Sequence, residues 1–253
     1  MEEQIKTVAR IKKEINMRQN GTLLYLTISG SDLYGFPSPD SDVDYRGVYI
    51  TDSNNILGLK GYKDVIELHP DIVLFEVKKE INLALAGNCN VLEHFNAPAI
   101  YKTPESMELS RLLNNALTKP GIYNSYRGMA TFNYKKFILQ GKKSYKKYLY
   151  VFRGLMAGIH ALNTGRIQPD INELNQYFKI KEVAELIKFK QERAEEAEVE
   201  DLKNSGKLDS LIIQLYQRLD DSYPKSKIPT EQDPKDLRMI NEFLLRIRKN
   251  KMV

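Results

Sequence analysis

The sequence predicts an α+β protein in which an N-terminal αβ lobe with a small mixed sheet, residues 1–105, is followed by an all-helical C-terminal lobe, residues 106–253. Apolar, β-branched runs typical of strands occur only before about residue 105, and beyond it apolar residues recur at helical spacing. The length of 253 residues suits one large domain or two small ones. A composition of 42% hydrophobic and 28% charged residues excludes disordered and fibrous classes.

The front lobe begins with an amphipathic helix, because apolar residues recur at helical spacing over residues 3–18 and Asn20-Gly21 ends the pattern. Residues 32–41 are rich in Gly, Pro, Ser and Asp, which predicts a loop. A second helix ends at Gly87-Asn88. The predicted strands of this lobe are residues 22–28, 43–50 and 72–77.

The back lobe shows only helical periods, and no run in it has the character of a strand. We therefore expect every regular element beyond residue 105 to be a helix. The predicted helical segments are residues 112–117, 126–139, 145–162, 180–200, 208–219 and 237–247.

The formal net charge of +5 is concentrated in the middle of the chain. Residues 1–100 carry 10 basic and 14 acidic residues, residues 101–160 carry 11 and 2, and residues 161–253 carry 17 of each. Residues 123–152 also hold nine Tyr or Phe. Aromatic rings among cations are typical of surfaces that bind nucleobases and phosphates, although rings at helical spacing also serve as core. Lys135, Lys136, Lys142 and Lys143 are either solvated or form a weak, salt-sensitive path for RNA or DNA.

Cys89 is the only cysteine, which excludes an intrachain disulfide and a thiolate-rich zinc site. A cytoplasmic location is predicted, because such cysteine usage suits a reducing compartment. The amino terminus lacks the order of a signal peptide, and the most apolar early run, residues 22–28, is too short to span a bilayer. We therefore expect no membrane partner.

The stretch with the clearest chemical meaning is Gly30-Ser31, a turn-rich spacer, and Asp42-x-Asp44 at the start of a predicted strand. Side chains two apart on a strand project to the same side, so both carboxylates face one way. Neighbouring carboxylates repel unless a cation lies between them, and such hard oxygen ligands suit Mg²⁺ with substrate phosphates. The Gly30 backbone and the Ser31 hydroxyl fit phosphate oxygens. The sequence therefore predicts a magnesium and phosphate site.

Residues 30–48 resemble the active-site signature of the DNA polymerase β-like nucleotidyltransferase superfamily, in which a Gly-Ser turn precedes an Asp-x-Asp strand. More narrowly, the chain resembles the RNA-ligase-associated (RlaP-like) branch of predicted nucleotidyltransferases of bacteria and phages. The resemblance spans most of the chain. Further pieces matching that branch are residues 71–79, 87–93 and 125–130, Lys146 with Arg153, and Asn163-Thr164-Gly165.

The resemblance implies a two-metal transfer in which Asp42 and Asp44 hold Mg²⁺, with Mn²⁺ as a substitute. A third carboxylate on a neighbouring strand also binds metal and helps activate the acceptor hydroxyl, and its matching position is Asp71. Glu67 and Glu76 are the competing candidates for this third carboxylate.

Five residues are predicted to bind the nucleotide. Lys146 and Arg153 lie seven apart on one predicted helix face, in a segment with almost no acidic residues. The predicted nucleotide-binding residues are Gly30, Ser31, Arg127, Lys146 and Arg153. The chain departs from the branch at Cys89, where Pro is frequent, and at Tyr150, where His is frequent.

The leading functional hypothesis is an Mg²⁺-dependent nucleotidyltransferase that moves an NMP from an NTP such as ATP to a hydroxyl on an RNA end or a protein side chain. One alternative is a catalytically silent module that binds nucleotide or nucleic acid on the same scaffold. The presence of both Asp42 and Asp44 disfavours this alternative. A further alternative is an antitoxin-like regulatory enzyme that modifies a partner protein.

Overall fold

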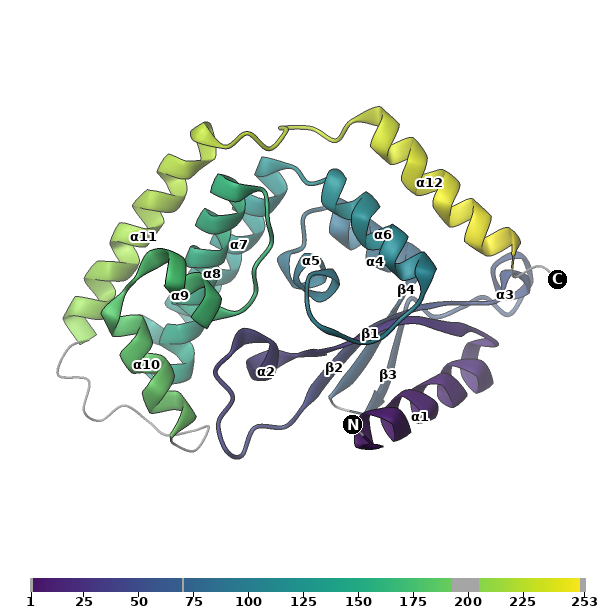
Figure 1. Cartoon of the computed structure of the whole chain (residues 1–253), viewed down its shortest axis with the longest axis horizontal. Coiled ribbons are helices and arrows are strands. Elements are labelled where there is room, and N and C mark those ends of the chain that lie inside the picture. Colours follow the sequence, from purple (N-terminus) through teal and green to yellow (C-terminus); the bar gives the residue numbers. More distant parts are fainter. Residues whose placement is uncertain (1, 70, 193–204, 251–253) are drawn as a thin grey trace. The chain divides into compact units, whose positions relative to one another are not determined.

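The computed structural model describes residues 2–69, 71–192 and 205–250, which form helices and one mixed sheet (Figure 1). The α+β class is confirmed. Contacts within the chain define two compact units. Unit 1 comprises residues 1–29, 43–117 and 231–253, and unit 2 comprises residues 30–42 and 118–230.

The sheet belongs to unit 1 and has the strand order β3-β4-β2-β1-β5. β2 and β4 pair in parallel, while β1 pairs antiparallel with β2 and β5, and β3 pairs antiparallel with β4. The strands are β1 (Thr22–Ser29), β2 (Asp44–Ile50), β3 (Val65–His69), β4 (Ile72–Glu76) and β5 (Ala99–Lys102).

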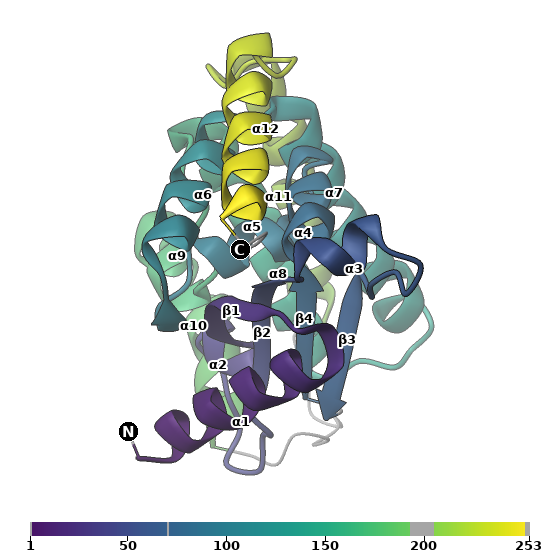
Figure 2. The same ribbon diagram turned by 90° about the vertical axis from the view of Figure 1, so that its right-hand side faces the viewer.

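Helices cover both faces of this sheet, as Figures 1 and 2 show. α1 (Glu2–Gln19) buries Ile11 and Ile15 against strand residues that include Leu23, Tyr49 and Leu74. The opposite face is covered by α4 (Val77–Leu85), α5 (Cys89–Phe95) and α6 (Pro104–Asn115). α3 (Ser53–Leu57) follows β2. Apolar burial on both faces holds the strand ends in fixed register.

The C-terminal helix α12 (Pro234–Lys249) packs along α6 in unit 1. Near its end, Arg248 Nη2 lies 3.0 Å from both carboxylate oxygens of Glu76 on β4. The Ser53 hydroxyl donates to the Arg248 carbonyl at 2.7 Å. The predicted boundary at residues 105 and 106 therefore does not coincide with the compact units. The assignment of catalysis and substrate binding to separate lobes stays a prediction.

Unit 2 is helical and is organised around α8 (Tyr145–Thr164). This helix packs against α7 (Lys119–Asn133), α10 (Lys181–Gln191) and α11 (Ser205–Lys225). At Gly158 the helices approach closely, because an added Cβ would lie 2.9 Å from Cβ of Tyr126 on α7. The predicted helix over residues 180–200 is observed as α10, and its residues 193–200 lie outside the described part. The remaining helices described in this unit are α2 (Gly30–Tyr34), the π-turn η1 (Tyr134–Ile138) and α9 (Ile171–Phe178).

Among the described helices, none combines the length and the apolar character that crossing a membrane requires.

Candidate active site

The Gly-Ser pair lies where the chain leaves β1. Gly30 follows the last residue of the strand and has φ +66°, in the left-handed region that glycine adopts without steric cost. This conformation turns the chain from the strand into the short helix α2. Ser31 is half-buried, and its carbonyl accepts from the Phe36 backbone N–H at 3.1 Å. The predicted loop over residues 32–41 therefore begins inside a helix rather than after it.

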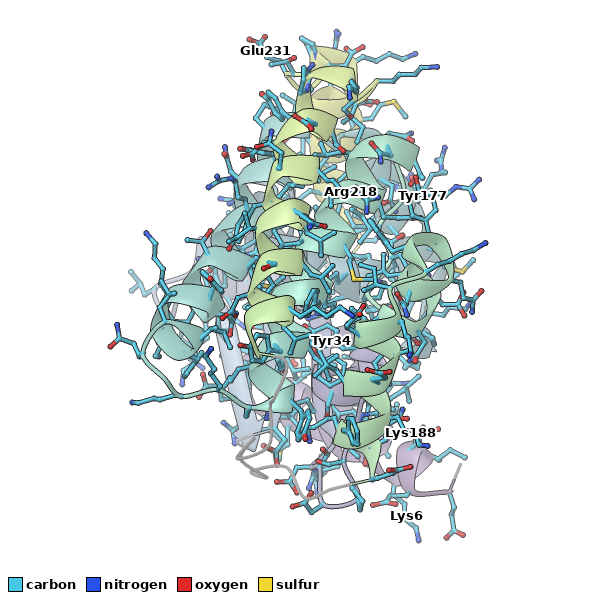
Figure 3. The ribbon with its side chains drawn as sticks, turned by 90° about the vertical axis from the view of Figure 1, so that its left-hand side faces the viewer. Lys6, Tyr34, Tyr177, Lys188, Arg218 and Glu231 are labelled. Carbon is cyan, nitrogen blue, oxygen red and sulfur yellow. The ribbon has the colours of Figure 1, made fainter. Side chains whose placement is uncertain are left out.

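The segment after Ser31 is anchored in unit 2 by aromatic packing. Tyr34 and Phe36 are buried, and each meets the ring of Tyr150 edge to face, with centroids 5.8 and 5.6 Å apart. The guanidinium carbon of Arg153 lies 3.6 Å from the Tyr34 ring centroid. Figure 3 labels Tyr34 among the helices of this unit. Tyr150 thus has a packing role in this unit.

Hydrogen bonds add a second anchor at Gly35, which has φ +80°. The side-chain amides of Asn172 and Gln191 donate to its carbonyl at 2.8 and 3.2 Å. A side chain at residue 35 would clash with Asn172 and Asp170, because an added Cβ lies 2.3 Å from an atom of each. Glycine is required at this position for both reasons.

Two of the residues predicted to supply carboxylates occupy neighbouring backbone positions in unit 1, at the starts of the parallel strands β2 and β4. Tyr45 pairs with Ile72, and the Tyr45 N–H donates to the Asp71 carbonyl at 2.6 Å. Asp44 and Asp71 precede these two residues, so they occupy neighbouring positions across the pair. Both are half-buried. The structure therefore brings Asp71 next to Asp44.

Arg46 joins these two strand starts and was not singled out from the sequence. Its Nη2 lies 3.4 Å from Asp44 Oδ1, and its Nη1 donates to the Asp71 carbonyl at 3.3 Å. Alternation along a strand puts residues 44 and 46 on the same face, which is the signal that could have identified Arg46. The guanidinium places one positive charge beside the Asp44 carboxylate.

The two competing carboxylates lie elsewhere. Glu76 ends β4, is fully buried, caps α4 by accepting from the Lys78 N–H at 2.8 Å, and pairs with Arg248. Burial raises the pKa of Glu76, and Arg248 opposes that rise. Glu67 is exposed on the outer strand β3, opposite Val73. Neither residue occupies a register position beside Asp44.

Asp42 is exposed and lies two residues before Asp44, so their Cα atoms are at most about 7 Å apart. Asp42 is grouped with unit 2 and Asp44 with unit 1. The donor chemistry fits Mg²⁺, because Asp42, Asp44 and Asp71 offer only carboxylate oxygens. Within the described ranges, however, no group of three or more His, Cys, Asp or Glu side chains is close enough to hold a metal ion.

A cavity of about 570 Å³ lies between α1 and the strand starts. Its apolar lining includes Ile28, Tyr45 and Ile72, while Arg10 and Asp71 contribute charge. One of the predicted carboxylates therefore lines a space large enough for a small-molecule group.

Two of the predicted nucleotide-binding residues contact other parts of the protein. Arg127 forms a two-point contact with Asp220, at 3.0 Å from Nε to Oδ1 and 3.4 Å from Nη2 to Oδ2. Arg153 is fully buried, and its Nη2 lies 3.4 Å from the Met129 sulfur. Lys146, on the same helix as Arg153, is half-buried. The guanidinium of Arg153 instead packs on the ring of Tyr34, which belongs to the segment after Ser31.

A mixed sheet on which a Gly-Ser turn follows one strand and an Asp-x-Asp pair opens its neighbour defines the polymerase β-like class. Within this class the chain belongs to the RNA repair pathway DNA polymerase beta family (RlaP), whose family model matches residues 1–246. This membership suggests a nucleotidyltransferase activity. Enzymes of this class usually use divalent metal ions.

Two curated relatives match over most of their length. The uncharacterized protein YcgL of Bacillus subtilis is 30% identical over 200 residues, covering 74% of this chain and 76% of the relative. The uncharacterized protein MJ0002 of Methanocaldococcus jannaschii is 29% identical over 219 residues, covering 82% and 87%. The similarity therefore extends to a bacterium and an archaeon.

Proposed function

We propose that the protein is an Mg²⁺-dependent nucleotidyltransferase that transfers an NMP from an NTP to a hydroxyl of an RNA end or a protein side chain. The observation that carries the proposal is the neighbouring position of Asp44 and Asp71 at the starts of two paired strands. It is supported by the Gly-Ser turn after β1 and by the family to which the chain belongs.

Asp42, Asp44 and Asp71 would hold the divalent ions, two Mg²⁺ with Mn²⁺ as a substitute. When bound, such ions neutralise phosphate charge and favour departure of pyrophosphate. Asp71 accepts the proton of the acceptor hydroxyl. That oxygen then bonds to the α-phosphorus, while the bond from this phosphorus to the bridging oxygen breaks and pyrophosphate leaves. Gly30 and Ser31 bind phosphate oxygens of the NTP.

The basic residues divide by their surroundings. Lys146 is the cation that we assign to the triphosphate, because it is half-buried on α8. Arg153 supports the Gly-Ser turn through Tyr34. Arg127 is engaged by Asp220 through Nε and Nη2, so its charge is already shared with a carboxylate. Arg46 holds Asp44 in position relative to β4.

The decisive experiment supplies the protein with each α-labelled NTP, Mg²⁺ and a mixture of cellular RNA and protein. Label in the RNA fraction or in the protein fraction supports the proposal and identifies the acceptor class. Label in neither fraction, with all four NTPs and with Mn²⁺ in place of Mg²⁺, contradicts it and favours a nucleotide-binding module without chemistry.

The third carboxylate can be tested with a matched pair of variants. Asp71→Asn should lower the transfer rate at least about 100-fold, because it removes the proton acceptor and one metal ligand. Glu67→Gln makes the same chemical change on exposed β3 and should leave the rate unchanged. Initial rates at saturating NTP measure both variants. Equal rates for Asp71→Asn and the unaltered protein would assign the third role elsewhere.

A further inference from the structure

An exposed basic and aromatic surface lies on the end of α7, on η1 and just beyond. It consists of Phe132, Lys135, Lys136, Leu139 and Lys142, which we call the 132–142 surface. Phe132 is 58% exposed and Leu139 is 61% exposed. The three lysines are also exposed. Two large apolar side chains are therefore open to water, seven residues apart in the sequence, with Lys135 and Lys136 between them.

The backbone turn beneath this surface is of π type. The Leu139 N–H donates to the Tyr134 carbonyl at 3.0 Å, five residues back. Ile138 is buried and fixes the turn to the unit. Such widened turns are rare and frequently occur at functional sites. Here the turn keeps Lys135, Lys136 and Leu139 outside the core.

The lysines on and beside this surface are held next to phenylalanine rings. Lys136 Nζ lies 4.9 Å from the Phe132 ring centroid and 5.3 Å from that of Phe137. Lys147 Nζ lies 3.8 Å from the Phe137 centroid. Ammonium groups are thus placed beside rings, and more than half of the Phe132 side chain remains open to a ligand.

The stretch of sequence that contains this surface carries charge of one sign. Residues 109–169 contain 11 Lys or Arg and no Asp or Glu. Lys143 pairs with Asp209, which comes from α11, at 3.1 Å. Among the described residues, Lys135, Lys136 and Lys142 form no salt bridge. A flexible polyanion would therefore meet little repulsion there.

We propose that the 132–142 surface binds single-stranded nucleic acid, with a base stacked on Phe132 and phosphates paired with Lys135, Lys136 and Lys142. An open aromatic ring among lysines matches the alternating bases and phosphates of a single strand. An acidic protein segment would use the lysines and leave Phe132 without a role. That the bound strand is the acceptor of transfer rests on the proposed function, whereas the binding does not.

Fluorescence anisotropy tests the binding with labelled oligonucleotides of about twelve nucleotides, a length within the usual site size of proteins that bind single strands. Oligo-U RNA and oligo-dT DNA are titrated with the full chain in EDTA and without NTP, so that no transfer occurs. Both should bind, because stacking and phosphate contacts do not read the 2′-hydroxyl. Affinity should fall with salt, with a log–log slope of about −0.7 for each phosphate contacted.

Two variants separate the contributions of charge and stacking. Lys135→Ala/Lys136→Ala should weaken binding and make the salt slope shallower by about 1.4, since two phosphate contacts are lost. Phe132→Ala should weaken binding roughly tenfold with an unchanged salt slope. The matched control is Lys12→Ala/Lys13→Ala on α1, which also removes two positive charges. As at Lys136, one of the two ammonium groups lies beside an aromatic ring, because Lys12 Nζ is 3.9 Å from the Tyr101 ring centroid. It should bind normally.

Three results would overturn the proposal: no measurable binding by the unaltered chain, equal losses in the α1 control and the surface variant, or poly-glutamate binding with the same dependence on Phe132. The proposed transfer is separable from this test. An Asp44→Ala chain should bind both oligonucleotides normally, because the binding does not use this carboxylate. Normal binding by the unaltered chain, together with no transfer by the unaltered chain, would contradict the proposed function alone.

Discussion

Asp44→Ala should abolish nucleotidyl transfer while the chain still folds. Asp44 directly precedes Tyr45, which pairs with Ile72, so Asp44 lies beside Asp71 along the backbone, and removing it takes away one proposed metal ligand and its charge. Loss of a single preorganised electrostatic group commonly costs 10²- to 10³-fold in rate, and we expect at least about that loss here. Incorporation of α-labelled NMP measures the transfer, and circular dichroism with thermal unfolding measures the fold.

The fold should survive because Asp44 is half-buried and its carboxylate forms a salt bridge with Arg46, at 3.4 Å from Oδ1 to Nη2. Such a partly exposed pair contributes under about 1 kcal/mol to stability. Asp42→Ala, at an exposed position, should lose transfer in the same way.

Asp52→Ala is the control for Asp44→Ala. Asp52 caps α3 by accepting from the Asn54 N–H at 2.8 Å, at the opposite end of β2. Its removal should cost about 1 kcal/mol of stability and leave transfer intact. If Asp42→Ala or Asp44→Ala retained full activity, the proposed metal-dependent transfer would be wrong.

The long elements of the fold were predictable because their signal repeats over many residues. The helix expected over residues 3–18 is α1, and the segment 145–162 is most of α8. β3 and β5 were missed because they carry little alternation. β5 has no buried residue, and β3 is a short outer strand with exposed Glu67. Pairing with neighbouring strands, rather than their own pattern, makes them strands.

The candidate site was predictable only where it is local in sequence. The spacing of Asp42 and Asp44 is visible without a structure. The position of Asp71 beside Asp44 depends on the parallel pairing of β2 with β4, in which Tyr45 pairs with Ile72, 27 residues further along the chain. The partner of Arg127 is Asp220, 93 residues further along the chain. Periodicity carries no information on such pairings.

The docking of α12 against unit 1 shows the same limit. The apolar stripe of residues 237–247 predicts an amphipathic helix but not the surface that it covers. The pairing of Arg248 with Glu76, 172 residues away, fixes that surface. Helix α12 therefore belongs to the same compact unit as α1 and the sheet.

Arg248→Met should destabilise unit 1 by about 3 kcal/mol, the second large effect that the structure predicts. Glu76 is fully buried and the Arg248 side chain is only 14% exposed, so the variant leaves a buried carboxylate without its charged partner. Urea unfolding monitored by circular dichroism measures the loss, and the melting temperature should fall by several degrees.

Arg246→Met is the control, two residues away on the same helix. Arg246 pairs with Glu108, but their side chains are 53% and 35% exposed, and a pair so open to water contributes under about 1 kcal/mol. Equal losses of stability in the two variants would show that the pairing of Glu76 does not hold α12 in place.

The loss caused by Arg248→Met should also depend on pH. Burial raises the pKa of Glu76, and Arg248 opposes that rise, so the variant raises the pKa further. A folded chain that holds a proton on Glu76 more tightly than the unfolded chain is favoured in acid and loses this advantage as pH rises through the folded pKa. The difference in unfolding free energy between the variant and the unaltered protein should therefore be smaller at about pH 5 than at about pH 8. A difference independent of pH over this range would mean that the carboxylate is not the group left unpaired.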